Sequence, residues 1–241
     1  MIAQICEESK CTGCLACMNL CPCGAITCQE REDGNVIPQI DPEKCIECHR
    51  CVQGCPENHV KEKHEPRQCY AAWQKDRKER KYSASGGIAF GFYKRWIQNA
   101  GIVYGAAFNE KGILTQQKAE TLEEARKFRG SKYVQSYNGF SYSEIGKELK
   151  KGEKVLFIGT PCQIAGLKAY LGKASDALVT IDLICHGTPP MSYLEEYIKE
   201  IAGAEKVDRV SFRGEKDYHM VFYSQDRVVY SQRFRKDLYY T

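Results

Sequence analysis

The pattern of apolar and polar positions changes near residue 82. Before it, residues 25–41 alternate apolar and polar side chains on either side of an Asp33-Gly34 pair. Alternation with a period of two is typical of strands, and Asp-Gly is a favoured hairpin turn. The pattern therefore predicts a short β-hairpin in this stretch.

From residue 82 onward, helical and strand patterns alternate. Residues 83–101 begin with small side chains and then place Ile88, Phe92 and Trp96 on one predicted helical face. Residues 102–108 and 112–117 read as strands, and a capping box of Thr121 and Glu124 opens the next helix.

A strand, a helix and a second strand follow one another in the last third. Residues 153–172 read as a buried strand leading into a helix, Leu178 to Ile184 as another strand, and 190–203 as a helix with an apolar stripe. Two strands joined by a helix pair in parallel through a right-handed crossover. The sequence thus predicts an α/β domain with a mixed, partly parallel sheet.

The cysteines are the strongest chemical signal. Fourteen occur in 241 residues, and eight of them form the run CxxCxxCxxxCP twice, with a repeat of 34 residues. Three thiolates spaced by two residues wrap one cluster, while the fourth reaches the neighbouring one. The spacing predicts two 4Fe-4S clusters with crossed ligation, one held by Cys11, Cys14, Cys17 and Cys55 and the other by Cys45, Cys48, Cys51 and Cys21.

The first 60 residues resemble a bacterial-type ferredoxin, so the predicted fold is an α+β ferredoxin-like head followed by the α/β domain. A pair of zinc sites is the alternative, although zinc sites usually combine two CxxC units across a longer loop. Cys6, Cys23 and Cys28 fall outside both runs and are interpreted as small packing residues, and His49 as a surface residue rather than a ligand.

Charge and hydropathy add a domain division. Residues 1–60 carry four Lys/Arg against nine Asp/Glu, so the remainder of the chain is basic. We expect a ferredoxin domain at 1–60, a linker and helix at 61–81, and the α/β domain at 82–241. No nucleic-acid motif accompanies the basic excess, so cofactor phosphates or an acidic redox partner are the expected binding partners of this region.

No membrane span or leader is evident, so a cytoplasmic location is expected.

Two thiols are expected at the binding edge of the parallel sheet, where such folds hold ligands. Cys162 follows one predicted strand and Cys185 closes the next, beside His186. These three residues are the candidate catalytic groups. Each cysteine alone would more often be a buried packing residue.

A second candidate site is a phosphate cradle at the start of the helix near residue 88, where backbone N–H groups and the helix dipole favour anions. An ordinary helix cap, with a solvated basic loop beside it, is the alternative. The predicted cofactor-binding residues lie in these two segments: Ser83, Ser85, Gly86, Gly87, Ser131, Lys132, Tyr133, Gln135 and Ser136.

The segments SASGG, GSKYVQS, GTPCQIAGLK and DLICHGTPP, in this order after the cysteine runs, resemble the coenzyme F420 hydrogenase/dehydrogenase beta-subunit family. The resemblance implies FAD beside the iron-sulfur clusters, and electron transfer between a two-electron carrier and a redox protein or further subunits. An electron-carrying or docking subunit without its own substrate site is the alternative. Family members usually continue past the position where this sequence ends, so we expect a truncated flavin domain, with Cys162 and Cys185 as half of a third ligand set.

Overall fold

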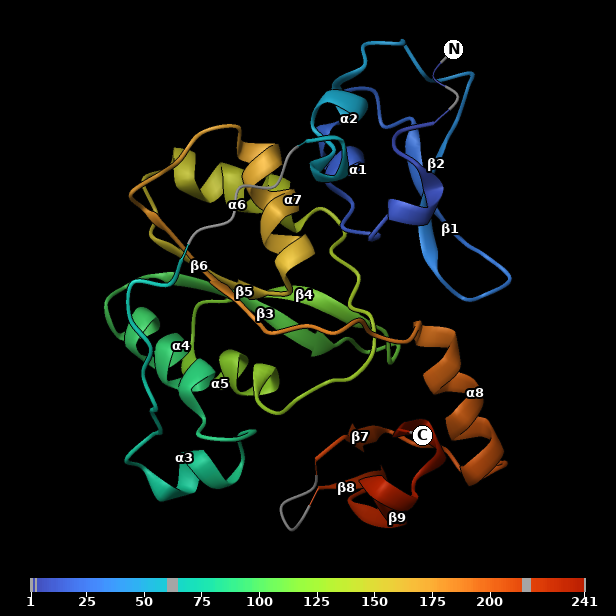
Figure 1. The fold of residues 1–241 in the computed structure, drawn as a ribbon. Coiled ribbons are helices and arrows are strands. Elements are labelled where there is room, and N and C mark those ends of the chain that lie inside the picture. Colours follow the sequence, from blue (N-terminus) through green and yellow to red (C-terminus); the bar gives the residue numbers. More distant parts are fainter. Residues whose placement is uncertain (1, 3, 60–64, 214–217, 241) are drawn as a thin grey trace.

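The computed structural model of the protein describes residues 2, 4–59, 65–213 and 218–240. Three groups of elements follow one another along the chain: a cysteine-rich region, a four-stranded sheet with helices, and a C-terminal helix with a three-stranded sheet (Figure 1). The predicted boundary at residue 60 and the first linker residues, 61–64, lie outside the described residues. The linker's expected helix is α3 (Arg77–Lys81), capped by Asp76.

The cysteine-rich region, which we call the ferredoxin region, comprises residues 2 and 4–59. Strands β1 (Ile26–Glu30) and β2 (Val36–Ile40) pair antiparallel, which confirms the predicted hairpin. The other elements are short because each has only a small core to pack on; they are η1 (Glu8–Lys10), α1 (Ala16–Leu20), α2 (Arg50–Gln53) and η2 (Pro56–Asn58). The core consists of a few apolar side chains and the thiols themselves.

The central sheet has the strand order β4-β3-β5-β6. Its strands are β3 (Ile102–Phe108), β4 (Leu114–Ala119), β5 (Val155–Gly159) and β6 (Leu178–Asp182). Strand β3 is antiparallel to β4 and parallel to β5, and β5 is parallel to β6. The predicted mixed sheet is therefore confirmed.

Helices cover both faces of this sheet (Figure 1). Their bounds are α4 (Ile88–Gln98), α5 (Leu122–Ala125), η3 (Arg126–Phe128), α6 (Ser141–Lys150) and α7 (Pro161–Leu171). Side chains of β3 alternate between the two faces, as a strand requires: Tyr104 packs with α6 and α7, whereas Val103 packs with α4 and η3.

Two predictions for these elements need correction. In α4 the buried side chains are Phe90 and Tyr93, while Phe92 is 48% exposed. The sheet packs against the neighbouring apolar stripe of α4, the one that contains Phe90 and Tyr93. The apolar spacing of the helix is equally consistent with either stripe being buried. Strand β6 ends at Asp182 rather than Ile184, because pairing with β5 stops at Gly159. The capping box at Thr121 and Glu124 is confirmed.

The C-terminal part was not predicted beyond its helix. It contains α8 (Met191–Ala202), β7 (Arg209–Ser211), β8 (His219–Ser224), β9 (Arg227–Arg233), η4 (Phe234–Lys236) and η5 (Leu238–Tyr240). Its core is rich in aromatic rings, and the buried Asp237 accepts hydrogen bonds of 3.0 Å from the hydroxyls of Tyr197 and Tyr230. Among the described residues, no helix is long and apolar enough to cross a membrane.

Candidate functional site

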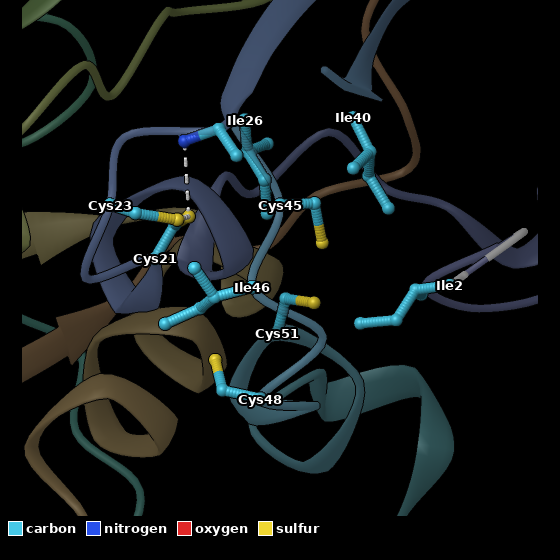
Figure 2. A pocket seen from close by; sticks show the side chains of 10 residues that line it. Ile2, Cys21, Cys23, Ile26, Ile40, Cys45, Ile46, Cys48 and Cys51 are labelled. Atoms are coloured by element: carbon cyan, nitrogen blue, oxygen red, sulfur yellow. Dashed lines mark hydrogen bonds between the residues drawn. The ribbon is translucent and has the colours of Figure 1, made fainter. Parts of the chain in front are cut away.

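Two pockets lie in the ferredoxin region. The eight cysteines of the two runs divide between them in the crossed pattern that the spacing predicts. We name the pockets A and B by their thiols: pocket A is lined by Cys11, Cys14, Cys17 and Cys55, and pocket B by Cys21, Cys45, Cys48 and Cys51. Figure 2 shows the four thiols of pocket B around one space, with Ile2, Ile26 and Ile40 beside them.

The sequence repeat is also a repeat of backbone conformation. Gly13 and Glu47 occupy equivalent positions between the first two cysteines of each run, and both have positive φ angles, +64° and +54°. Leu15 and His49 are equivalent in the same way, with φ angles of 61° and 56°, and each precedes a short helix. The two CxxCxxC turns therefore present their thiols in the same manner.

Two thiols outside the runs also line the pockets, a placement that their spacing did not reveal. Cys6 lies in the wall of pocket A and Cys23 in that of pocket B. Their interpretation as plain packing residues is therefore incomplete. Cys28 does pack as expected, with its sulfur 4.0 Å from Sδ of Met18, and His49 is exposed.

In pocket A, Cys17 and Cys55 are buried and Cys11 and Cys14 are half-buried, and this affects the ionisation of the thiols. Burial, foremost, raises the pKa of Cys14 to about 11, and it also raises the pKa of Cys17. Thiolate is the form that binds metals. Iron must therefore displace protons from these sulfur atoms when it binds. Within the described residues, no three His, Cys, Asp or Glu side chains are grouped so as to hold a single metal ion.

Pocket A faces the central sheet. The carbonyl oxygen of Cys14 accepts hydrogen bonds from Tyr142 Oη (2.9 Å) and Asn138 Nδ2 (3.0 Å), both at the start of α6. Asn19 in α1 donates to the carbonyl of Gly139 at 2.9 Å. Pocket B lies on the outer side, where Cys48 is exposed and Ile46 is 63% exposed.

Cys162 lies at the first turn of α7, next to the N-cap Thr160, whose Oγ1 is 3.1 Å from the Cys162 sulfur. Helices α1 and α7 are in contact, and after burial itself the charge of Cys162 also raises the pKa of Cys14. Cys162 is therefore close to pocket A. Cys185 and His186 lie instead in the exposed segment after β6, where Cys185 Sγ accepts a hydrogen bond from the backbone N–H of Gly187. The prediction that Cys185 closes this strand is therefore wrong, because Cys185 lies beyond the end of β6 at Asp182.

The predicted phosphate cradle is partly occupied by the chain itself. A Cβ atom on Gly86 would lie 2.6 Å from the carbonyl oxygen of Ala72, and Gln74 hydrogen-bonds to the carbonyls of Gly86 and Gly87. The absence of a side chain at Gly86 therefore lets residues 72–74 of the chain itself approach closely, in the place where a phosphate was predicted. Ser83 Oγ donates to the Glu79 carbonyl, and Ser85 Oγ accepts from Arg213.

The predicted loop 131–136 runs from this helix start toward α7. At one end, Arg129 forms an ion pair of 2.7 Å with Glu79, and Lys132 Nζ donates to the carbonyls of Lys127 and Arg129. Tyr133, in the middle, packs its ring against Phe212 and Tyr240.

At the other end of this loop, Gln135 packs near Gly13 of pocket A, while Ser136 Oγ accepts a 2.8 Å hydrogen bond from Gln163. Gln163 in turn accepts from Gln116, which sequence reasoning missed because a lone glutamine in a strand carries no signal.

Comparison with known proteins gives two family matches. Residues 10–59 match the 4Fe-4S dicluster domain, and residues 152–237 match the C-terminal region of the coenzyme F420 hydrogenase/dehydrogenase beta subunit. The class of the molecule is therefore that of iron-sulfur proteins with two 4Fe-4S clusters. More specifically, its C-terminal part is similar to the C terminus of the coenzyme F420 hydrogenase/dehydrogenase beta subunit, and its N-terminal part to the dicluster domain.

Individual relatives agree with this. A subunit of the F420H2 dehydrogenase of Methanosarcina mazei is 25% identical over 200 residues, which cover 76% of this chain and 55% of that protein. A subunit of the Na+-translocating ferredoxin:NAD+ oxidoreductase complex of Acetobacterium woodii is 44% identical over 48 residues, 20% of this chain and 13% of that protein. The chain thus spans about half the length, or less, of these curated relatives.

A solved structure is also similar. A chain of the F420-reducing NiFe hydrogenase complex from Methanosarcina barkeri has a TM-score of 0.48 and 18% identity. The similarity covers 68% of this chain and 59% of that one.

Proposed function

We propose that the protein is an iron-sulfur subunit of an oxidoreductase that passes single electrons through two 4Fe-4S clusters. Pocket A would hold one cluster through its four run cysteines, and pocket B the other. The observation that carries the proposal is the division of the eight thiols between two pockets in the crossed pattern.

The residues present fit such clusters. Each pocket offers four cysteine sulfur atoms, the ligand set of a 4Fe-4S cluster, and the clusters supply one-electron chemistry when bound. Apolar side chains beside the thiols exclude water, and burial is one of the factors that set cluster potentials.

The placement of the pockets supports an order of electron transfer. Pocket A contacts the central domain through Cys14, whereas pocket B opens on the far side, near the exposed Ile46. The cluster in pocket A would exchange electrons with a group in the central domain. The cluster in pocket B would then exchange them with a redox protein or another subunit.

We further propose that this group is FAD, with its phosphates near Ser83 to Gly87 and its ring near Cys162. Three observations support a single elongated site. Arg129 is joined to Glu79 in α3, the helix that precedes α4; Ser136 is joined to Gln163; and Cys162 lies near pocket A. The oxygen Oε1 of Gln116 is buried and has no partner in the described part of the chain. This oxygen could accept a hydrogen bond from an N–H group of a bound ligand.

For the electron donor we propose a two-electron carrier of the deazaflavin type, which would reduce FAD. The name of the Methanosarcina mazei relative, a subunit of an F420H2 dehydrogenase, supports this choice. Cys185 and His186 are exposed after β6 and would approach this carrier. The alternative is an electron-transfer or docking subunit with clusters and no flavin.

Anaerobic purification followed by iron, sulfide, zinc and flavin analysis tests these proposals. About eight iron and eight sulfide atoms per chain are expected from two complete ligand sets. Stoichiometric zinc in their place would overturn the cluster proposal. Eight iron atoms without saturable FAD binding would favour the alternative subunit.

A pair of variants tests the phosphate site. Arg129→Gln should weaken FAD binding in a fluorescence titration, because it removes a cation beside the predicted phosphates. Arg126→Gln is the matched control, since Arg126 also lies near Glu79, at 3.8 Å, but forms its closer ion pair with Glu123. Equal effects of the two changes would contradict this location of the phosphates.

A further inference from the structure

Each pocket is lined by five thiols, although a cluster needs four. In both pockets the fifth thiol comes from outside the two cysteine runs. In pocket A, Cys6 lines the same pocket as Cys55 and Cys11. In pocket B, the sulfur of Cys23 is 3.7 Å from that of Cys21 (Figure 2). The fifth thiol of pocket B therefore lies beside the crossed ligand, the one that comes from the other repeat, and the fifth thiol of pocket A shares its pocket with the crossed ligand Cys55.

Specific contacts keep Cys6 in this place. The side-chain amide of Asn58 donates to the carbonyl of Ile5 and to that of Val52, both at 2.9 Å. Ile5 is itself buried in the core of the ferredoxin region. These contacts hold the segment with Cys6 against the turn that carries Cys55.

Cys23 is positioned differently, by the chain itself. It follows Cys21 by two residues across Pro22, and its side chain is exposed. The next residue, Gly24, has a φ of +65°, and a Cβ atom placed on it would meet no other atom within 4 Å, so the turn has space around it. The Cys23 thiol thus lines pocket B from a turn that is open to solvent.

Resting on the proposed clusters, we infer that Cys6 and Cys23 are reserve ligands that replace Cys55 and Cys21. When the crossed cysteine leaves its iron atom, that iron–sulfur bond breaks and the reserve sulfur forms a new one. The reserve thiol releases a proton to water, and the departing thiolate takes one up, so no electron is transferred. The exchange keeps four cysteine ligands on the cluster.

Iron content separates this role from simple packing. Cys55→Ser should retain about eight iron atoms per chain, with an altered EPR signal from one reduced cluster. Cys55→Ser combined with Cys6→Ser should lose iron and that signal. The matched control combines Cys55→Ser with Cys28→Ser, because Cys28 lies in the same region but packs on Met18 outside the two pockets; it should behave like the single variant.

Alkylation with iodoacetamide gives a readout that does not depend on the double variant folding. Cys23, whose side chain is exposed, should be labelled in the native wild-type protein and protected in Cys21→Ser, where it binds iron. Continued labelling of Cys23 in Cys21→Ser would overturn the inference.

The outcomes also separate this inference from the proposed function. A wild-type protein without about eight iron atoms refutes the clusters themselves. Suppose instead that the wild-type protein holds about eight iron atoms, but Cys55→Ser loses as much iron as the double variant. This result refutes only the reserve ligands.

Discussion

The hydroxyl of Tyr142 donates a 2.9 Å hydrogen bond to the carbonyl oxygen of Cys14, a residue 128 positions earlier in the chain. Tyr142 is fully buried, and its ring packs edge-on against Phe157 in the central sheet. The same hydroxyl accepts a 2.8 Å bond from Asn138. One tyrosine thus connects the pocket A loop to the core of the other domain.

Tyr142→Phe should lower the free energy of unfolding by about 1 kcal/mol, because it removes this bond while Asn138 still donates to Cys14. Anaerobic urea unfolding of the cluster-loaded protein measures the change. Tyr193→Phe, at a 46% exposed position in α8, is the control and should have little effect. Equal losses in the two variants would show that the contact contributes nothing.

Gly13→Ala should disturb pocket A specifically. A Cβ atom there would lie 2.7 Å from the side-chain amide of Gln135 and 2.9 Å from the carbonyl oxygen of Val36. Gly24→Ala is a matched control, since Gly24 has nearly the same φ but no neighbour within 4 Å. Both changes should lower the free energy of unfolding by about 1 kcal/mol through backbone strain. Any additional decrease in Gly13→Ala is then due to the clash with Gln135 and Val36. Equal unfolding midpoints would contradict this packing.

Crossed ligation predicts which variants act on the same cluster. Cys17→Ser and Cys55→Ser should both change the EPR component of pocket A, whereas Cys51→Ser and Cys21→Ser should change that of pocket B. Redox titration followed by EPR distinguishes the two components. If Cys55→Ser changed the same component as Cys51→Ser, each repeat would hold its own cluster.

The buried amino group of Lys132 should make the stability of the fold depend on pH. Burial lowers the pKa of its amino group from 10.5 to about 7. Between these values the unfolded chain binds a proton that the folded chain does not, so stability rises with pH across this window. Wild-type protein should therefore gain stability relative to Lys132→Met as the pH rises from about 7 to about 9.5. Thermal unfolding at the two pH values measures this, and parallel changes would show that Lys132 stays protonated in the fold.

The sequence predicted the elements that depend on local pattern. The hairpin, the capping box and the β5-α7-β6 unit each have a signature within a few residues, and the grouping of thiols in the pockets follows the 34-residue repeat. These features need no knowledge of distant contacts.

The features that were missed depend on distant contacts. Spacing could not place Cys6 beside Cys55, because the Asn58 amide that fixes its segment is 53 positions away from Ile5. Nor could periodicity decide which stripe of α4 faces the sheet, since Phe90 is selected by packing. The crowding at Gly86 arises from residues 72–74, whose extended course has no sequence signature.

The hairpin turn of the ferredoxin region has a consequence for how electrons could travel. A Cβ atom on Gly34 would lie 2.4 Å from the Ser192 hydroxyl and 2.8 Å from the ring of Pro190, so the hairpin tip touches the start of α8. Asn19 and Cys14 are held by α6 on another side. A carrier domain fastened at separate points cannot swing between donor and acceptor. Electron transfer into pocket A would then proceed over a fixed separation, at a rate insensitive to solvent viscosity.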